Sequence, residues 1–333
     1  MNKLTVLMPV FNAEKYLSSS ICSILSQTYG EFIFIILDDG STDGSLAIIE
    51  AFAAIDERII VKSNVNNQGI AKCRDALLSF VDTEYFAWMD ADDISLPHRF
   101  KSQIVYLDAH PDVGAVSAGY IDFYSLAKYI PETDPDKIAV NMLTANAMIN
   151  PVAMVRTDVA KKTTFSFERC GVISATDYAF WVSMRDVSKL KVIPECLLIY
   201  RMHQQQESSA NGSAQQSSAK RIVAKQFTAL GINVDESILD DLLLFPGAEP
   251  AKYSFIEIGR LYKKAIQVNK INKVFSQAHL VSSLSSRYMS YCKFFGLSGV
   301  FMYIRHMGVM SLLDKRNFGF DFIVRCFTFR RNN

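Results

Sequence analysis

Apolar and polar positions along the first 120 residues predict strands and helices in turn. Five apolar runs predict strands, at residues 4–9, 32–37, 59–62, 84–89 and 113–121. The segments between them predict four helices, at residues 13–25, 44–55, 69–80 and 97–109. We expect Asn12 and Asp43 to cap the first two helices, because short polar side chains accept hydrogen bonds from the free N–H groups there. The alternation predicts an α/β fold with a twisted, mostly parallel sheet and helices on both faces.

Polar residues follow these predicted strands, at the edge of the sheet where folds of this class bind ligands. The first four segments are Pro9-Val10-Phe11-Asn12-Ala13-Glu14, Asp38-Asp39-Gly40-Ser41-Thr42-Asp43, Asn66-Asn67-Gln68-Gly69 and Asp90-Ala91-Asp92-Asp93. Neither glycine-rich phosphate-binding pattern, G-x-G-x-x-G after the first strand or G-x-x-x-x-G-K-[ST] anywhere, is present. Carboxylates repel phosphate unless a divalent cation bridges the two. The sequence therefore favours phosphate binding through a divalent cation rather than phosphate binding by a glycine-rich loop.

The segment Asp90-Ala91-Asp92-Asp93 is the best candidate for that cation. Side chains two apart in an extended segment point the same way, so Asp90 and Asp92 can reach one ligand. A turn or a helix cap before Pro97 would account for the same residues, with Asp93 or Ser95 as the cap. The pair Asp38-Asp39 can likewise be only a turn.

Six segments in order give the chain a family resemblance. They read "VLMPVFNAEKYLSSSICSILSQTY", "ILDDGSTDGS", "NQGIAKCRDAL", "DADDISLPHRF", "ATDYAFW" and "YRMHQQQESS". Over about residues 3–210 the chain resembles family 2 inverting glycosyltransferases with the GT-A fold, of the bacterial cell-surface polysaccharide type. The resemblance implies a Rossmann-like sheet that binds a nucleotide-sugar.

The resemblance also implies a nucleotide site. It places there Pro9, Phe11, Glu14, Asp39, Arg74, Asp90 and Ala91. Asp39 would accept hydrogen bonds from the uracil or ribose, and Arg74 would contact the base. Phe11 stands where the family more often has Tyr. The alternatives are that Asp39 only caps a turn and that Arg74 is a surface residue.

A metal site and a catalytic base follow from the same resemblance. Asp92 and His203 would bind Mn²⁺ or Mg²⁺, which would also bind the donor diphosphate and offset the charge that develops on it. Asp177 would take the proton from the acceptor hydroxyl, in a direct displacement without a covalent intermediate. The family more often has Glu before this Asp, where this chain has Thr176. Alternatively, Asp177 caps a helix over residues 178–184 and His203 is structural.

Residues 204–219 are rich in Gln, Ser, Ala and Asn and have no hydrophobic periodicity. Such a segment predicts little order. In the family the matching loop folds over the donor, and a linker between domains is the alternative. We expect residues 1–219 to form the GT-A catalytic domain, with residues 203–219 as a flexible lid or linker. Residues 220–333 would then form a basic, amphipathic helical region.

The near-neutral total of 35 basic and 34 acidic residues hides an asymmetry along the chain. Residues 1–250 hold 21 basic and 31 acidic side chains, and residues 251–333 hold 14 and 3. Apolar residues recur at helical spacing over residues 255–268 and again over 271–288. The basic region is expected to contact a membrane surface or to pack as a helical bundle on a partner. Nucleic acid is disfavoured, because the basic residues are diluted among aliphatic ones.

The six cysteines are scattered, which favours reduced thiols and the cytoplasm. Residues 4–11 look like a first strand rather than a signal peptide. The uncharged stretch 138–155 contains too many polar residues for a transmembrane helix.

Together these features predict a metal-dependent, inverting glycosyltransferase that uses a nucleotide-sugar, most simply a UDP-sugar, and acts on a glycan or lipid-linked acceptor. The expected place is the cytoplasm, with peripheral contact at the inner face of the cell membrane. A polyprenyl-phosphate glycosyltransferase and an inactive nucleotide-binding scaffold subunit are the alternatives.

Overall fold

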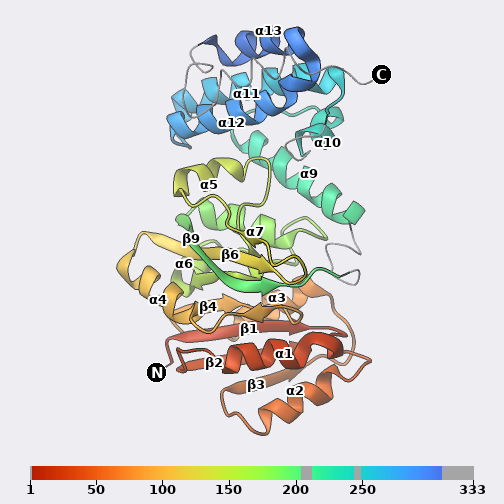
Figure 1. Cartoon of the computed structure of the whole chain (residues 1–333), viewed down its shortest axis with the longest axis vertical. Coiled ribbons are helices and arrows are strands. Elements are labelled where there is room, and N and C mark those ends of the chain that lie inside the picture. Colours follow the sequence, from red (N-terminus) through yellow and green to blue (C-terminus); the bar gives the residue numbers. More distant parts are fainter. Residues whose placement is uncertain (1, 204–211, 244–248, 310–333) are drawn as a thin grey trace. The chain divides into compact units, whose positions relative to one another are not determined.

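The computed structural model describes residues 2–203, 212–243 and 249–309 of the chain (Figure 1). The chain forms two compact units. The first contains residues 1–138 and 146–218, and the second contains residues 139–145 and 219–333.

The described part of the first unit is built on a nine-stranded sheet. Its strands, in spatial order, are β3 (Ile59–Ser63), β2 (Phe32–Asp38), β1 (Leu4–Val10), β4 (Tyr85–Trp88), β8 (Met154–Arg156), β6 (Val113–Asp122), β9 (Lys189–Tyr200) and β5 (Ile94–Ser95), with β7 (Lys128–Tyr129) paired to β6. Its helices are α1 (Glu14–Leu25), α2 (Ser45–Ala53), α3 (Ile70–Ser79), α4 (Arg99–Ala109), α5 (Pro135–Asn141), α6 (Thr157–Lys162), α7 (Thr176–Arg185) and the short η1 (Asn150–Val152). The sheet is mixed: β1–β4 are mutually parallel and β6 is parallel to β9, but β8 is antiparallel to both β4 and β6.

The α/β prediction is confirmed, but four strands of the sheet, β5, β7, β8 and β9, were not predicted from the sequence. β8 separates β4 from β6, and Met154 pairs with Ala87 on one side and with Val116 on the other. Because β8 runs antiparallel, the segment that precedes it lies at the edge where β4 ends. This edge is also where β1 and β2 end, since those strands are parallel to β4.

Apolar side chains from both faces of the central strands are buried. The chain segment of β1 alone contributes Leu4, Val6, Leu7 and Met8, all fully buried. On one face α1 packs with Leu17, Ile21 and Ile24 in the same apolar cluster as β2 and β4. Burial of this kind, at about 25 cal/mol per Å² of apolar surface, is the main source of stability for such a sheet.

Capping at the first helix differs from the prediction. Ala13 is the N-cap residue of α1, and Asn12 makes no cap hydrogen bond there. Asn12 instead has a left-handed backbone (φ 48°), and its Oδ1 accepts from the backbone N–H of Thr42 at 2.8 Å. Asp43 does bond the start of α2, because its Oδ1 accepts from the N–H of Ser45 at 3.0 Å.

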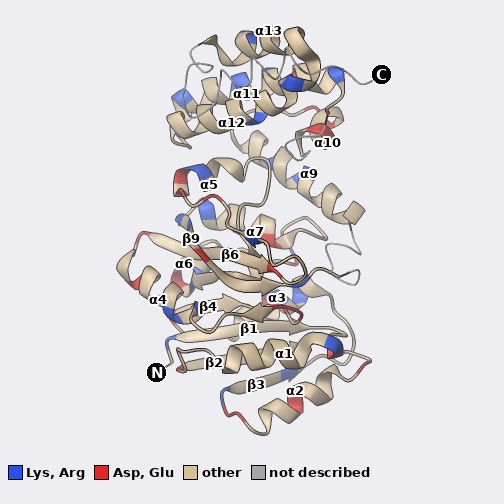
Figure 2. Cartoon of the chain, viewed as in Figure 1, with Lys and Arg blue, Asp and Glu red and all other residues tan. Residues whose placement is uncertain are grey.

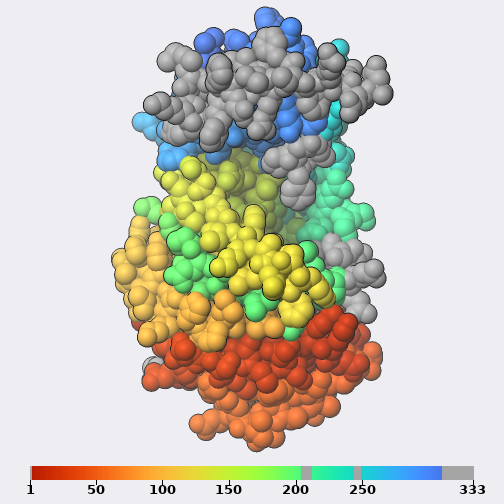
Figure 3. Space-filling view, viewed as in Figure 1, coloured from red at the N-terminus to blue at the C-terminus, as the bar shows by residue number. Residues whose placement is uncertain are grey.

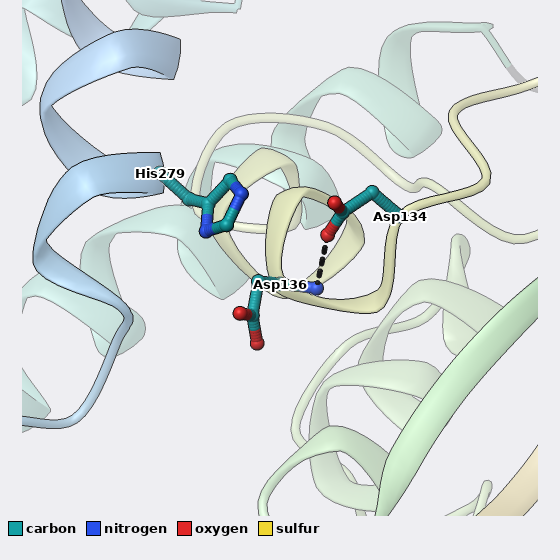
Figure 4. Close-up of side chains that lie close together, drawn as sticks. All are labelled: Asp134, Asp136 and His279. Carbon is teal, nitrogen blue, oxygen red and sulfur yellow. Dashed lines mark hydrogen bonds between the residues drawn. The ribbon is translucent and has the colours of Figure 1, made fainter.

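Two exposed features of the first unit lie away from the core. Asp134 Oδ1 accepts from the backbone N–H of Asp136 at 2.9 Å at the start of α5, the dashed bond of Figure 4. The hairpin of β6 and β7, yellow in Figure 3, exposes large apolar side chains. These are Phe123, Tyr124, Leu126 and Tyr129.

The second unit is helical where it is described. It contains the later part of α9 (Gly212–Ala229), η2 (Glu236–Ile238), α10 (Leu239–Leu242), α11 (Lys252–Asn272), α12 (Gln277–Cys292), η3 (Lys293–Phe295) and α13 (Gly296–Met307). Tyr262, Tyr288 and Tyr303 are fully buried among these helices. A side chain at Gly259 would lie only 2.5 Å from the Tyr288 hydroxyl, so the close approach of α11 and α12 requires glycine there. Figure 2 shows basic residues along α11 and α12 and acidic ones at α10.

Three expectations about this region need correction. Residues 139–145 belong to the second unit rather than to the first, because Met142 and Leu143 are buried and the Met142 carbonyl accepts from Gln226 Nε2 at 2.9 Å. Residues 212–219 are helical rather than unordered, since Ala and Gln are good helix formers; residues 204–211 of the predicted lid lie outside the described residues. The apolar pattern from Ile271 is not one helix, because α11 ends at Asn272 and leaves Ile271 exposed.

Within residues 2–203, 212–243 and 249–309, no helix is both long and apolar enough to cross a membrane. Residues 310–333, the end of the predicted basic segment, lie outside the described residues.

Candidate active site

A cavity of about 680 Å³ opens at the carboxyl ends of β1, β2 and β4 in the first unit. It collects nearly all the residues that the sequence singled out, although they are spread over almost 200 positions. Of the predicted site residues it is lined by Pro9, Phe11, Asp39, Arg74, Asp90, Ala91, Asp92, Asp177 and His203. The sheet thus brings the predicted nucleotide, metal and base positions to one place.

Glu14 does not line this cavity, contrary to the expectation from the resemblance. Its Oε2 accepts from the backbone N–H of Gly44 at 2.7 Å. Gly44 is the N-cap residue of α2, and a carboxylate at a helix N-terminus satisfies a free N–H and favours the helix dipole. In this structure Glu14 therefore joins α1 to α2.

Asp39 is almost completely buried at the end of β2 and organises the neighbouring loop. Its Oδ1 accepts from Asn64 Nδ2 at 2.7 Å and from the N–H of Gln68 at 2.9 Å. Its Oδ2 accepts from the N–H of Gly69 at 2.8 Å. A carboxylate has about four acceptor positions, so these three bonds fix its orientation.

Arg74 is a buried residue of α3, not a surface one. Its Nη1 donates to Thr176 Oγ1 at 3.1 Å. The guanidinium also lies over the rings of Trp88 and Phe167, 6.0 and 5.7 Å from their centroids. Thr176 thus connects Arg74 to the first turn of α7. It is the residue that stands where the family more often has Glu.

The acidic segment after β4 presents its carboxylates together. Asp90, Asp92 and Asp93 each have an oxygen within 4.8 Å of the others. His203 Nε2 lies 2.8 Å from Asp92 Oδ2, and the ring of Tyr16 lies against the imidazole, with centroids 4.8 Å apart. Two donor atoms this close match neighbouring ligands on an octahedral cation, which at bond lengths of roughly 2.1 Å are about 3 Å apart. The carboxylate oxygens suit Mg²⁺ or Mn²⁺, whereas the imidazole nitrogen suits a first-row transition metal, so the mixed donor set fits Mn²⁺ better than Mg²⁺.

Asp93 is fully buried and lies behind this group. Burial raises the pKa of its carboxyl well above the ordinary value, and the charges of Asp92 and Asp90 raise it further. Its Oδ1 accepts from the backbone N–H of Arg201 at 3.0 Å. It does not cap α4, whose N-cap residue is His98, so its part is to hold the segment that follows β9 against the acidic loop.

Arg201 is a residue of this site that the sequence analysis did not single out. Its Nη1 donates to the carbonyl oxygen of Asp92 at 2.7 Å, and its Nη2 donates to Ser19 Oγ at 3.1 Å. These bonds fix the backbone on either side of the Asp92–His203 pair. The only signal in the sequence was its place between Tyr200 and His203 in a recognised segment.

Asp177 lies in the first turn of α7, whose N-cap residue is Ala175, so the alternative of an Asp177 cap is wrong. Its Oδ2 accepts from Asn146 Nδ2 at 2.9 Å. Asn146 Oδ1 accepts from the N–H of Met148 at 3.1 Å, which fixes which end of the amide faces Asp177. No pattern in the sequence pointed to Asn146, since it lies 31 positions from Asp177.

Comparison with known proteins places the chain in a family. Residues 5–170 match the family model "Glycosyl transferase family 2". An uncharacterized glycosyltransferase of Methanocaldococcus jannaschii is 31% identical over 206 residues, which cover 60% of this chain and 70% of that protein. This chain belongs to glycosyl transferase family 2. It is a glycosyltransferase, as the sequence predicted.

Other family 2 relatives extend the match. An uncharacterized glycosyltransferase of Haemophilus influenzae is 29% identical over 281 residues, covering 80% of this chain and 86% of the relative. A UDP-Glc:alpha-D-GlcNAc-diphosphoundecaprenol beta-1,3-glucosyltransferase of Escherichia coli is 29% identical over 211 residues, covering 62% and 79%. An O-antigen biosynthesis glycosyltransferase of Escherichia coli is also similar to this chain, at 28% identity over 217 residues.

Solved structures confirm the predicted GT-A fold. Residues 1–349 of TarS from S. aureus, in complex with UDP-GlcNAc, match with a TM-score of 0.59 at 16% identity, over 96% of this chain and 91% of that one. A mannosyltransferase of Pyrobaculum calidifontis, in complex with GDP-Man and Mn²⁺, matches with a TM-score of 0.54 at 14% identity, over 97% and 85%. The fold therefore extends beyond the family match, which ends before Asp177 and His203.

Proposed function

We propose that this glycosyltransferase moves a sugar, with inversion, from a UDP-sugar to a hydroxyl group of a glycan or lipid-linked acceptor in cell-surface polysaccharide synthesis, with Mn²⁺ or Mg²⁺ as cofactor. The observation that carries the proposal is one cavity lined by Asp39, by the Asp92–His203 pair and by Asp177. A nucleotide site, a cation site and a base are the three parts that the reaction needs.

The nucleotide is proposed to bind between the loops that follow β1 and β2. Pro9, Phe11 and Asp39 line that end of the cavity. Arg74 also lines the cavity, as does Lys15, and Arg74 is proposed to contact the base. The UDP-GlcNAc complex of TarS and the UDP-Glc donor of the E. coli relative support a UDP-sugar. The neighbour with GDP-Man makes GDP-sugars the comparison to include in any test.

Asp92 and His203 would hold the cation, with Asp90 within reach. The metal ion would supply positive charge to the diphosphate as the sugar leaves it. Arg201 and Asp93 keep this part of the site rigid from behind. We therefore place the diphosphate of the donor at the Asp92 end of the cavity.

Asp177 would act as the general base. A carboxylate there can accept the proton of an acceptor hydroxyl while that oxygen attacks the anomeric carbon. Asn146 donates to the other side of the same carboxylate and holds its orientation. Asn146 is thus a positioning residue for the base.

The variant Asn146→Ala is expected to lower kcat about tenfold and to leave the Kd for UDP unchanged, because it removes one hydrogen bond to a charged group. That bond holds the orientation of the Asp177 carboxylate, so its loss should slow the chemical step without weakening nucleotide binding. Asn66→Ala, which removes an exposed amide that does not line the cavity, is the control. An unchanged kcat would contradict the role of Asn146.

The second unit is proposed to contact a membrane surface peripherally, on the inner face of the cell membrane. On α13, Leu297, Phe301 and Ile304 are exposed at helical spacing, and Arg305 is exposed beside them. Basic and apolar groups on one helix suit an anionic lipid interface, where a lipid-linked acceptor would lie. Cosedimentation with vesicles containing phosphatidylglycerol, against vesicles of phosphatidylcholine alone, tests this contact, and equal recovery from both would contradict it.

A donor screen tests the proposed function directly. The purified protein is incubated with Mn²⁺ and each of a panel of UDP-sugars and GDP-sugars, and the release of free nucleotide is measured. We expect slow hydrolysis of a UDP-sugar, because water can replace the missing acceptor. If no nucleotide-sugar is hydrolysed and none binds, the proposal fails. Binding without hydrolysis would favour the inactive scaffold.

A further inference from the structure

Asn150 is a buried polar residue of the cavity that lacks a hydrogen-bond partner. It lines the cavity beside Asp90 and Asp177, and its relative exposure is 5%. Neither Oδ1 nor Nδ2 finds a partner among the residues that the structure describes. Buried amide groups are nearly always paired, so an unpaired one at a ligand cavity points to a partner that arrives with the ligand.

The backbone around Asn150 is held firmly, so its side chain cannot easily turn elsewhere. Ser117 Oγ bonds both the N–H and the carbonyl of Ile149, at 3.1 and 2.9 Å. Gln103 Nε2 donates to the Val152 carbonyl at 2.6 Å. The ring of Pro151 further restricts the backbone of the residue before it. Two side chains that are themselves fully buried thus fix the segment that presents Asn150.

The sheet places this segment between the two ends of the reaction site. The Trp88 N–H donates to the Ala153 carbonyl at 3.0 Å, so the residues before Ala153 run beside the end of β4 and toward Asp90. Four residues before Asn150, Asn146 bonds Asp177. Asn150 therefore lies on a segment that connects the base to the neighbourhood of the acidic group.

A sugar transferred in this cavity must occupy the space between those two groups. In the proposed function the diphosphate lies at Asp92 and the attacking hydroxyl at Asp177, and the sugar ring links them. We propose, on the basis of that function, that the Asn150 carboxamide hydrogen-bonds a hydroxyl or acetamido group of the donor sugar. A hydroxyl both donates and accepts, as does an amide, so each can satisfy the other.

Because neither polar atom of its amide has a partner among the residues that the structure describes, Asn150 acts as a specificity residue. A site built to bond a substrate hydroxyl rejects an analogue that lacks it, because the buried polar group then stays unpaired. The identity of the sugar should therefore matter at Asn150, whereas the nucleotide alone should not.

The test compares two affinities in wild type and in Asn150→Ala. By calorimetry with Mn²⁺, the Kd is measured for UDP and for the UDP-sugar that binds most tightly among UDP-Glc, UDP-Gal, UDP-GlcNAc and UDP-GalNAc. We expect the ratio of the UDP-sugar Kd to the UDP Kd to rise about tenfold in the variant, the loss of one or two neutral hydrogen bonds. Asn66→Ala, which removes an exposed amide that does not line the cavity, is the control and should leave the ratio unchanged.

The thermal midpoint of the free protein separates binding from structure. Since Asn150 has no partner to lose among the described residues, Asn150→Ala should melt no lower than the wild type. A lowered midpoint with an unchanged Kd ratio would overturn the inference and give Asn150 a structural role. An unchanged ratio at an unchanged midpoint would overturn it as well. A wild type that binds neither UDP nor any UDP-sugar would instead overturn the proposed function, and this inference with it.

Discussion

The variant Asp177→Asn is expected to lose sugar transfer by roughly 10³-fold, within the range for removal of a general base. The amide has the shape of the carboxylate and can still accept from Asn146 through its oxygen, so α7 and the cavity should keep their structure. It cannot take a proton from an acceptor hydroxyl at neutral pH. The Kd for UDP should therefore stay within a factor of two or so of the wild type. The measurement is the rate of transfer at saturating donor, together with UDP binding by calorimetry.

Asp186→Asn is the matched control for this experiment. Asp186 is exposed at the other end of α7, where it pairs with Arg185. Its loss should change neither rate nor binding, because exposed ion pairs contribute little. Normal turnover by Asp177→Asn would remove Asp177 from the role of base, and a loss of UDP binding would mean that it supports the nucleotide site.

Removal of the metal should also stop sugar transfer. Chelation with EDTA is expected to abolish transfer and added Mn²⁺ to restore it, because the departing diphosphate needs a compensating charge. Asp92→Asn should reduce kcat roughly 100-fold or more. It should also reduce the gain in UDP affinity that Mn²⁺ provides, which calorimetry with and without Mn²⁺ measures.

The exposed Asp82 provides the control for this substitution, since it lies before β4 and away from the cavity. Asp82→Asn should respond to EDTA and Mn²⁺ as the wild type does. Full activity of the wild type in excess chelator would exclude the proposed cofactor. A Mn²⁺ effect on UDP affinity that survives in Asp92→Asn would assign the metal to other ligands.

The fold was predictable wherever a strand or helix carries its own signal in consecutive residues. The run from Phe32 to Leu37 is apolar throughout, and with Asp38 it forms a strand buried on both sides. β8 was not predictable, because only Met154–Arg156 pair and they follow a long uncharged stretch without alternation. Its antiparallel insertion depends on two distant partners, β4 and β6, and not on any local pattern.

Residues of the candidate site were predictable where they come directly after a strand. Asp39 and Asp92 follow β2 and β4, and parallel strands deliver their ends to one edge. The contact of Glu14 with the start of α2 was not predictable, because a position within a helix does not indicate which neighbouring element a side chain contacts. Asn146 and Arg201 escaped notice because their importance comes from contacts with residues 31 and 109 positions away.

The direction of β8 has a consequence for how donor choice can change without a change of fold. A parallel strand gives the active edge of a sheet the loop that comes after it, whereas an antiparallel strand gives it the loop that comes before. Residues 146–150 can therefore vary in sequence while the loops after β1, β2 and β4, where we propose that the nucleotide and the cation bind, stay unchanged. Exchange of this short segment between family 2 enzymes is a route to chimaeras with a new sugar preference on an unchanged nucleotide site.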